Sequence, residues 1–153
     1  KESTKVHIAA HSNYALYVNG AFVDCGQYTD YEAYQVYDTL DITGFLKEGE
    51  NQLEIRQYVC GAEFSTGCPA IPGVIYEVVT EQVVRTRSTP GCMAGEDLHY
   101  ANLCEPISGQ LSYNFEYDAL AGETIFRPAV SAGKEKHLYP IPIHKLKLLP
   151  YCE

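Results

Sequence analysis

Apolar and polar residues alternate in short runs along the first 60 residues of the chain. Over residues 5–9, Val6 and Ile8 lie on one side of an extended segment and polar residues lie on the other. A period of two with one polar side is typical of a β-strand that has one face in solvent. Residues 53–59 show the same alternation, interrupted only by Gln57, and we expect them to form a core strand.

A β-hairpin is predicted between these two strands. Residues 14–18 and 21–25 are strand-like runs joined by the dipeptide Asn19-Gly20. Both residues of the dipeptide can adopt the positive φ that a two-residue type I′ turn requires. The segment therefore predicts two antiparallel strands in direct succession.

The pattern changes over residues 37–51. Asp41 precedes three apolar residues within 42–46, and its carboxylate can accept hydrogen bonds from the amide groups of a single helical turn. Gly49 can adopt the left-handed conformation that ends such a turn. We expect one short helical turn here, after which the chain re-enters the sheet.

The second half of the chain is less regular. Glycine, proline, serine and threonine dominate residues 61–72, which predicts a loop, and residues 74–84 are rich in β-branched residues, which predicts one long strand or a pair. Residues 88–110 form a long irregular stretch, and loops of that length usually have a function or an external contact. Alternation returns at 113–117, and the leucines of 144–148 would close the sheet.

These elements favour an all-β fold. The sequence contains no repeat, low-complexity tract or long amphipathic helix, so the economical architecture is a two-sheet sandwich with long irregular loops and at most short helical turns. A chain of 153 residues is long enough for one domain that buries roughly 68–70% of its unfolded surface. We expect residues 1–153 to be a single module. Because the chain starts at Lys1 and stops directly after a strand-like run, we expect it to be a fragment of a larger protein.

The charge of the chain excludes several classes of partner. Eleven basic residues against twenty acidic ones give a formal net charge of -9, which repels phosphate backbones and anionic membrane surfaces. No apolar run approaches the roughly 18 residues that span a bilayer. We therefore expect neither a nucleic acid nor a membrane as a partner.

The thiols and imidazoles do not have the spacing of a metal site. The chain has six cysteines, at positions 25, 60, 68, 92, 104 and 152, and five histidines, at positions 7, 11, 99, 137 and 144. No C-x-x-C pair or zinc-ligand spacing occurs among them. A disulfide framework stays open, but the absence of a secretory signal favours reduced thiols and slightly favours the cytoplasm, with a secreted parent protein as the alternative. We expect no cofactor.

Aspartates offer a second kind of metal site, for calcium. Asp24, Asp38 and Asp41 lie near one another in sequence, but they lack the spacing of an EF-hand loop. Capping of the short helical turn explains the presence of Asp41 without a metal ion. We therefore predict no metal ion.

Thirteen tyrosines and no tryptophan make the chain rich in rings that carry a hydroxyl group. Four residues of one connection between strands carry groups that suit a sugar: Tyr28, Asp30, Tyr31 and Tyr34. An aromatic ring can cover the C–H face of a pyranose while a carboxylate binds its hydroxyl groups, and rigid sandwiches display ligand sites on such connections. The alternative is that these tyrosines cover the edge of the sandwich or pack against another domain.

The order of several motifs resembles one enzyme family. Residues 37–51 resemble the jelly-roll modules of the galactose-binding-like type that accompany glycoside hydrolases. The wider order also includes a strand at 6–10, the hairpin at 14–20 and the motifs at 107–111, 116–119, 127–129 and 139–143. Together these segments resemble the N-terminal β-sandwich region of bacterial α-L-rhamnosidases. The resemblance is loose from 82 to 105 and departs at Phe126, where a tryptophan is expected before Arg-Pro-Ala.

The resemblance implies a non-catalytic module of a glycoside hydrolase. Rhamnosidases of this type carry their catalytic acids on an (α/α) barrel, which would follow this chain, so the implied partners are that catalytic domain and a rhamnose-containing glycan. The parent would hydrolyse terminal α-L-rhamnosides by inversion, with one carboxylic acid and one carboxylate. Within this chain we expect no catalytic residue: Glu116 and Asp118 would share one face of a strand, and neither Ser65 nor Ser108 lies in a nucleophile elbow.

Two other functions stay open. The chain could be a free-standing carbohydrate-binding or adhesion module, which tight glycan binding by the chain alone would favour. A large exposed apolar patch would instead favour a face that packs against another domain. An enzyme complete within 153 residues is the third alternative, which turnover of an aryl rhamnoside would support.

Overall fold

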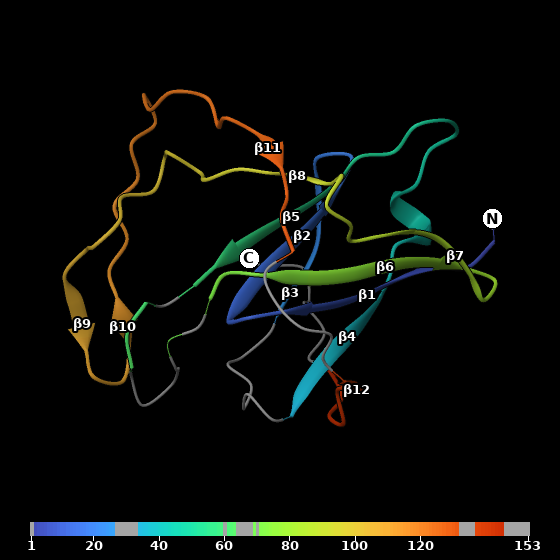
Figure 1. Ribbon diagram of the computed structural model, residues 1–153, viewed down its shortest axis with the longest axis horizontal. Coiled ribbons are helices and arrows are strands. Elements are labelled where there is room, and N and C mark those ends of the chain that lie inside the picture. Colours follow the sequence, from blue (N-terminus) through green and yellow to red (C-terminus); the bar gives the residue numbers. More distant parts are fainter. Residues whose placement is uncertain are drawn as a thin grey trace, which may run out of the picture.

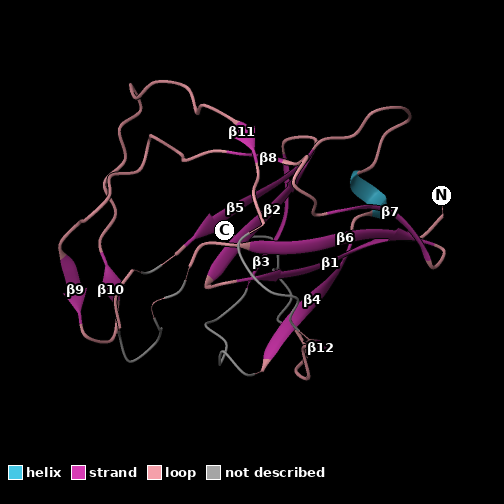
Figure 2. Ribbon diagram, viewed as in Figure 1, coloured by secondary structure: helices cyan, strands magenta, loops and turns pink. Residues whose placement is uncertain are grey.

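The computed structural model describes residues 2–26, 34–59, 61–63, 69, 71–131 and 137–145. In chain order the elements are β1 (Thr4–Ala10), β2 (Asn13–Val18), β3 (Ala21–Gly26), β4 (Gln35–Asp41), the 3-10 turn η1 (Thr43–Phe45), β5 (Leu53–Tyr58), β6 (Val74–Thr80), β7 (Val83–Arg87), β8 (Met93–Ala94), β9 (Pro106–Ser108), β10 (Ser112–Tyr113), β11 (Arg127–Pro128) and β12 (Leu138–Pro140). Figures 1 and 2 show how strands dominate the chain. No helix among the described residues has the length and apolar character needed to span a membrane.

Two sheets pack face to face. One has the strand order β12-β4-β1-β6-β7 and the other has the order β3-β2-β5. Nine buried residues from both sheets form one cluster: Val6, Ile8, Ala10, Tyr14, Leu16, Val18, Leu40, Ile42 and Val78. The prediction of an all-β sandwich is confirmed, while the jelly-roll, galactose-binding-like topology stays a prediction.

The N-terminal strands lie where the hydrophobic pattern predicts them. Val6 and Ile8 of β1 are fully buried, whereas Lys5 is exposed. The β2–β3 hairpin turns at Asn19 and Gly20, whose φ angles of 52° and 80° are those of a type I′ turn. Local patterning and turn chemistry agree here, so both predictions are confirmed.

The segment after β4 corrects one prediction. Asp41 accepts a hydrogen bond from the Thr43 amide at 2.8 Å, and the short turn η1 follows, as expected. The turn ends at Leu46 in an extended conformation, so the expectation that Gly49 ends it is wrong. Gly49 has a φ of 81°, but in a separate loop that folds around the Asn51 side chain, which accepts from the Lys47 amide at 2.9 Å and donates to the Gly49 carbonyl at 3.0 Å.

The polar residue that interrupts the β5 pattern joins the two sheets. The Gln57 side-chain amide donates to the backbone carbonyls of His11 at 2.6 Å and Gly73 at 3.1 Å, and its oxygen accepts from the Gly73 amide at 3.1 Å. Gly73 directly precedes β6, in the sheet opposite β5. A hydrophobic residue at position 57 could satisfy none of these backbone groups.

The second half of the chain builds the expected strand pair and an unexpected arm. Residues 74–84 form β6 and the start of β7, with a tight turn between them. Residues 92–130, which we call the arm, form a long interrupted hairpin: β8 pairs with β11 at its base, Tyr100 pairs with Tyr117 midway, and β9 pairs with β10 at its tip. In Figure 1 the arm runs from yellow to orange and extends away from the sandwich.

The arm and the C-terminal part correct two further predictions. Of the expected strand at 113–117 only Tyr113 lies in a strand, β10, and Phe115 is 79% exposed. The expected closing strand at 144–148 lies largely outside the described residues. A strand that the pattern did not predict, β12, instead pairs in parallel with β4 at the sheet edge.

We expect Gln57→Leu to lower the free energy of unfolding by about 1–3 kcal/mol, because it removes the three hydrogen bonds between the Gln57 side-chain amide and the backbone of His11 and Gly73. Urea unfolding measures the change as a lower midpoint. The matched control is Gln52→Leu, since the Gln52 side chain is exposed, and it should stay within about 0.5 kcal/mol of the parent chain. Equal midpoints for the two variants would contradict the role of Gln57.

Candidate functional site

The predicted sugar-binding segment is only partly described. Tyr28, Asp30 and Tyr31 lie outside the described residues. Tyr34, directly before β4, is 49% exposed and its ring stacks on that of Tyr139 in β12, with centroids 4.4 Å apart and an angle of 11° between the planes. The parallel pairing of β12 with β4 brings these two tyrosines together from more than 100 positions apart. Sequence patterning carried no signal for Tyr139.

The three aspartates considered for calcium have separate roles. Asp41 holds the Thr43 amide, whereas Asp24 and Asp38 both face the ammonium group of Lys145, at 3.3 and 3.5 Å. A lysine therefore supplies the positive charge between the two carboxylates. Among the residues that the structure describes, no three His, Cys, Asp or Glu side chains gather as a metal site would require.

Asp38 is the centre of a buried polar network. Its side chain is 3% exposed, and Oδ2 accepts a hydrogen bond of 2.6 Å from the Tyr14 hydroxyl. Lys145 Nζ donates to the Tyr14 oxygen at 3.3 Å and lies over the Tyr14 ring. Burial, and then the hydrogen bond and charge of Asp38, raise the pKa of Tyr14 well above its usual value. The network links β2, β4 and the segment that follows β12, so we assign it a structural role.

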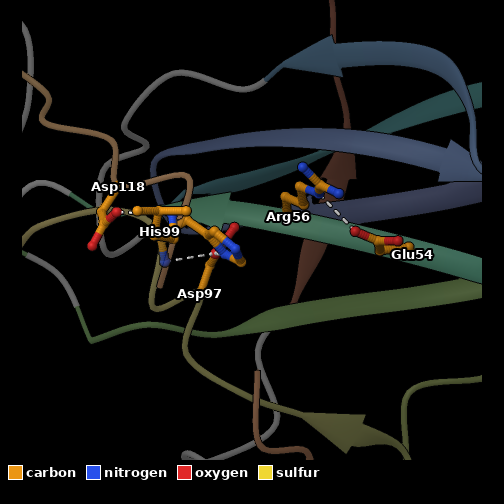
Figure 3. Close-up of polar contacts among 6 residues, drawn as sticks. Glu54, Arg56, Asp97, His99 and Asp118 are labelled. Atoms are coloured by element: carbon orange, nitrogen blue, oxygen red, sulfur yellow. Dashed lines mark hydrogen bonds and ion pairs between the residues drawn. The ribbon is translucent and has the colours of Figure 1, made fainter. Parts of the chain in front are cut away.

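A second polar cluster lies where the arm passes β5 (Figure 3). The backbone amide and Nδ1 of His99 donate to Asp97 Oδ1 at 3.1 and 2.9 Å, and these bonds, helped by the nearby charge of Arg56, lower the pKa of Asp97. On β5, Arg56 Nε donates to Glu54 at 2.6 Å while the guanidinium group lies 4.8 Å from the centre of the Tyr17 ring. Both pairs are accessible to solvent, so each contributes little to stability.

The two acidic residues Glu116 and Asp118 of the arm form hydrogen bonds through their backbone groups. The Asp118 amide donates to the His99 carbonyl at 2.8 Å, and the Glu116 carbonyl accepts from the Ala101 amide at 3.0 Å. Asp118 Oδ1 accepts from the Leu120 amide at 2.8 Å, which closes a local turn. The two contacts between the Asp118 and His99 and the Glu116 and Ala101 backbones hold the two sides of the arm together.

The serine and cysteine side chains show ordinary local contacts. Ser108 Oγ accepts from two amide groups of the turn at the arm tip, and Ser65 lies outside the described residues. Cys25, Cys92 and Cys104 are free thiols, and the other three cysteines lie outside the described part of the chain. The Tyr76 hydroxyl at 3.2 Å lowers the pKa of the Cys92 thiol, while burial and this contact raise the pKa of Tyr76 to about 12.

One open hollow of about 540 Å³ lies beside the loop before β5. Its lining residues are Lys47, Glu50, Asn51 and Gln52. Glycoside hydrolysis needs two carboxyl groups on opposite sides of the sugar, about 5–9.5 Å apart. Glu50 is the one carboxylate among the described residues that line this hollow, so these residues do not provide that arrangement.

The surface of the arm is unusually apolar. Twelve of the 21 exposed large apolar side chains found among the described residues lie on it: Met93, Leu98, Tyr100, Leu103, Ile107, Leu111, Phe115, Tyr117, Leu120, Ile125, Phe126 and Val130. Leu103 is 99% exposed and Leu120 is 93% exposed. No arm residue belongs to the core cluster. A concentration of exposed apolar side chains on one projecting segment favours a site that contacts another protein surface.

Comparison with known proteins supports the fold. No protein-family model matches the chain, and no curated protein matches its sequence. Among solved structures, the chain is similar to a GH78 family rhamnosidase of Bacillus sp. GL1, with a TM-score of 0.67 at 21% sequence identity. The match covers 92% of this chain and 16% of that chain. The chain therefore has the fold of one segment of a rhamnosidase and spans a small part of that protein's length.

Gly26→Ala should destabilise the chain, because a Cβ atom at this position would lie 2.6 Å from Asp38 Oδ2, which Tyr14 holds in place. We expect a loss of about 1–3 kcal/mol and a fall in Tm of about 2–4 °C for each kcal/mol. Gly44→Ala is the matched control, since a Cβ atom there meets nothing within 4 Å. Thermal unfolding followed by circular dichroism separates the two, and equal Tm values would contradict the tight packing at Gly26.

Alkaline pH should weaken the fold through Tyr14. Its raised pKa means that the folded chain keeps the phenol proton where the unfolded chain, with a pKa near 10.0, releases it. This contribution to stability is complete below that pH and is lost as the pH rises above it. Urea unfolding of the parent chain and of Tyr14→Phe, from about pH 8 to pH 11, should show a steeper decline for the parent chain. Parallel declines would show that Tyr14 does not carry the effect.

Proposed function

We propose that this chain is a non-catalytic N-terminal β-sandwich module of an α-L-rhamnosidase-like glycoside hydrolase, and that its arm packs against the catalytic domain of the same parent chain. The observation that carries the proposal is the arm, whose twelve exposed apolar side chains take no part in the core. The likeness to a segment of the Bacillus sp. GL1 rhamnosidase supports the enzyme context, because most of that chain lies outside the match.

The energetics of the arm favour a covering surface. Burying a leucine side chain contributes about 1.5–3 kcal/mol, so Leu103 and Leu120 alone offer about 3–6 kcal/mol to a partner that covers them. The arm itself is held by short ladders of two or three residues and by isolated contacts such as the Tyr100–Tyr117 pair. Such a projection gains order when a neighbouring domain packs on it.

The acidic groups of the chain support a non-catalytic role. Asp38, the most buried carboxylate described, is engaged by Tyr14 and Lys145. Among the described residues that line the hollow beside the loop before β5, Glu50 is the one carboxylate. Under this proposal the two carboxyl groups that cleave terminal α-L-rhamnosides belong to the catalytic domain of the parent.

A free-standing carbohydrate-binding or adhesion module is the alternative, and the exposed apolar side chains of the arm disfavour it. A module that works alone would leave these twelve apolar side chains in water, where exposed patches beyond a few hundred Å² favour aggregation. A domain within a larger enzyme covers the same side chains at no such cost. The arm therefore favours the attached module.

The proposal predicts that the arm is protected in the parent enzyme and open in the isolated chain. Hydrogen exchange should be slower in the parent for amides of the arm, while exchange within β1 and β2 should be equal in both. The substitutions Leu120→Gln and Ile125→Gln should change the unfolding free energy of the isolated chain by less than about 0.5 kcal/mol yet lower the Tm of the parent. The contrasting control is Ile8→Ala in the core, expected to cost the isolated chain about 2–5 kcal/mol.

Two results would contradict the proposal. Equal exchange of the arm amides in parent and isolated chain would show that the arm does not pack against another domain. Turnover of an aryl rhamnoside by the purified 153-residue chain would show that the chemistry lies within it. In the second case, loss of turnover on substitution of the acidic residues would identify the catalytic groups.

A further inference from the structure

Three aromatic side chains form a compact group at the β12 edge of the five-stranded sheet. The rings of Tyr34 and Tyr139 are stacked, with centroids 4.4 Å apart, and His137 meets Tyr139 edge-on, with centroids 4.5 Å apart and an angle of 72° between the planes. Tyr34 is 49% exposed and Tyr139 is 36% exposed. Because Tyr139 stacks on one face of the Tyr34 ring, a ligand that stacks on Tyr34 would use the opposite face.

The backbone holds this group in place before any ligand arrives. The parallel pairing of β12 with β4 sets Leu138 opposite Gln35 and Tyr139 opposite Val36. The Ile141 amide donates to the Tyr37 carbonyl at 3.0 Å and extends the pairing by one residue. A ring that is already stacked loses little conformational freedom when a ligand covers its other face, and sites built on strands are more precise than sites on loops.

We propose that Tyr34, Tyr139 and His137 form a carbohydrate-binding platform, on which a neutral pyranose ring stacks against the free face of Tyr34. The apolar C–H groups of a pyranose face match an aromatic ring, and the phenol hydroxyls and the imidazole supply donors and acceptors for sugar hydroxyl groups. A neutral sugar fits because a net charge of -9 repels acidic sugars.

The chemistry of the platform differs from that of the arm. Ten of the twelve exposed apolar side chains on the arm, all but Tyr100 and Tyr117, carry no hydroxyl group, and four of them are leucines, at positions 98, 103, 111 and 120. Each member of the platform pairs an aromatic body with a polar group, which suits a ligand that is apolar on one face and hydroxylated at its rim. The arm therefore suits a protein surface, and the platform suits a sugar.

The two surfaces also lie apart. In Figure 1, β12 lies on the lower side of the sandwich, whereas β9 and β10 lie at the far end of the arm. The platform does not depend on the proposed enzyme context. Binding at Tyr34 and packing of the arm can each be tested while the other is left intact.

The test is a nuclear magnetic resonance titration of the 153-residue chain with methyl α-L-rhamnopyranoside, methyl β-D-galactopyranoside and methyl α-D-glucopyranoside. We expect saturable, millimolar binding of at least one of them, with the largest shifts at Tyr34 and Tyr139. Tyr34→Ala should weaken binding by about tenfold or more, while Tyr34→Phe should retain most of it because the ring remains. A methyl glucuronide should bind more weakly than its neutral counterpart.

Tyr100→Ala is the matched control, because Tyr100 is 48% exposed and lies on the arm. It should leave the affinity unchanged, and near-identical spectra of the variants outside the substituted positions would show that all are folded. No saturable binding of any of the three sugars would overturn the platform, and so would binding that Tyr34→Ala and Tyr139→Ala leave intact. Neither result affects hydrogen exchange of the arm, so the proposed function is tested independently of the platform.

Discussion

The pairing of one buried carboxylate organises this fold. Asp38 points from β4 into the space between the sheets, where an unpaired charge is strongly unfavourable. Tyr14 from the opposite sheet donates to it at 2.6 Å, and Lys145 from the segment after β12 supplies the opposite charge. The two sheets and the C-terminal part of the described chain therefore meet at one oxygen atom. The same atom occupies the space that a side chain at Gly26 would need, so the network also restricts the sequence around it.

The sandwich and the arm follow different physical rules. In the sandwich, apolar residues from both sheets pack together, and Gln57 satisfies the backbone groups where β5 approaches the start of β6. In the arm, backbone hydrogen bonds such as that from the Asp118 amide to the His99 carbonyl hold the two sides together, and apolar side chains are exposed to solvent. A chain that completes one core and leaves a second apolar surface uncovered has the character of a module within a larger assembly. That contrast, with the structural likeness to part of a rhamnosidase, is the basis of the functional proposal.

Parts of the candidate sites were accessible from sequence and parts were not. Tyr34 could be proposed because aromatic and acidic residues cluster around it in sequence, and Asp41 could be assigned to a cap because its amide partner is two residues away. Tyr139 and Lys145 could not be found in this way. Each is more than 100 positions from the residue it meets, Tyr34 and Asp38 respectively, and is brought there by strand pairing or by a buried charge. Asp24 and Asp38 are 14 positions apart in sequence, and only the tertiary structure shows that both carboxylates face the ammonium group of Lys145.

The sequence by itself determined the strands of the sandwich and the β2–β3 hairpin. Alternation with a period of two and the positive φ of Asn19 and Gly20 are properties of a few adjacent residues, so they can be read locally. Tertiary structure alone decided two other features: the arm in place of a strand at 113–117, and the parallel pairing of β12 with β4. These features depend on which distant segment supplies the hydrogen bonds, and the pattern of a few adjacent residues does not identify that segment.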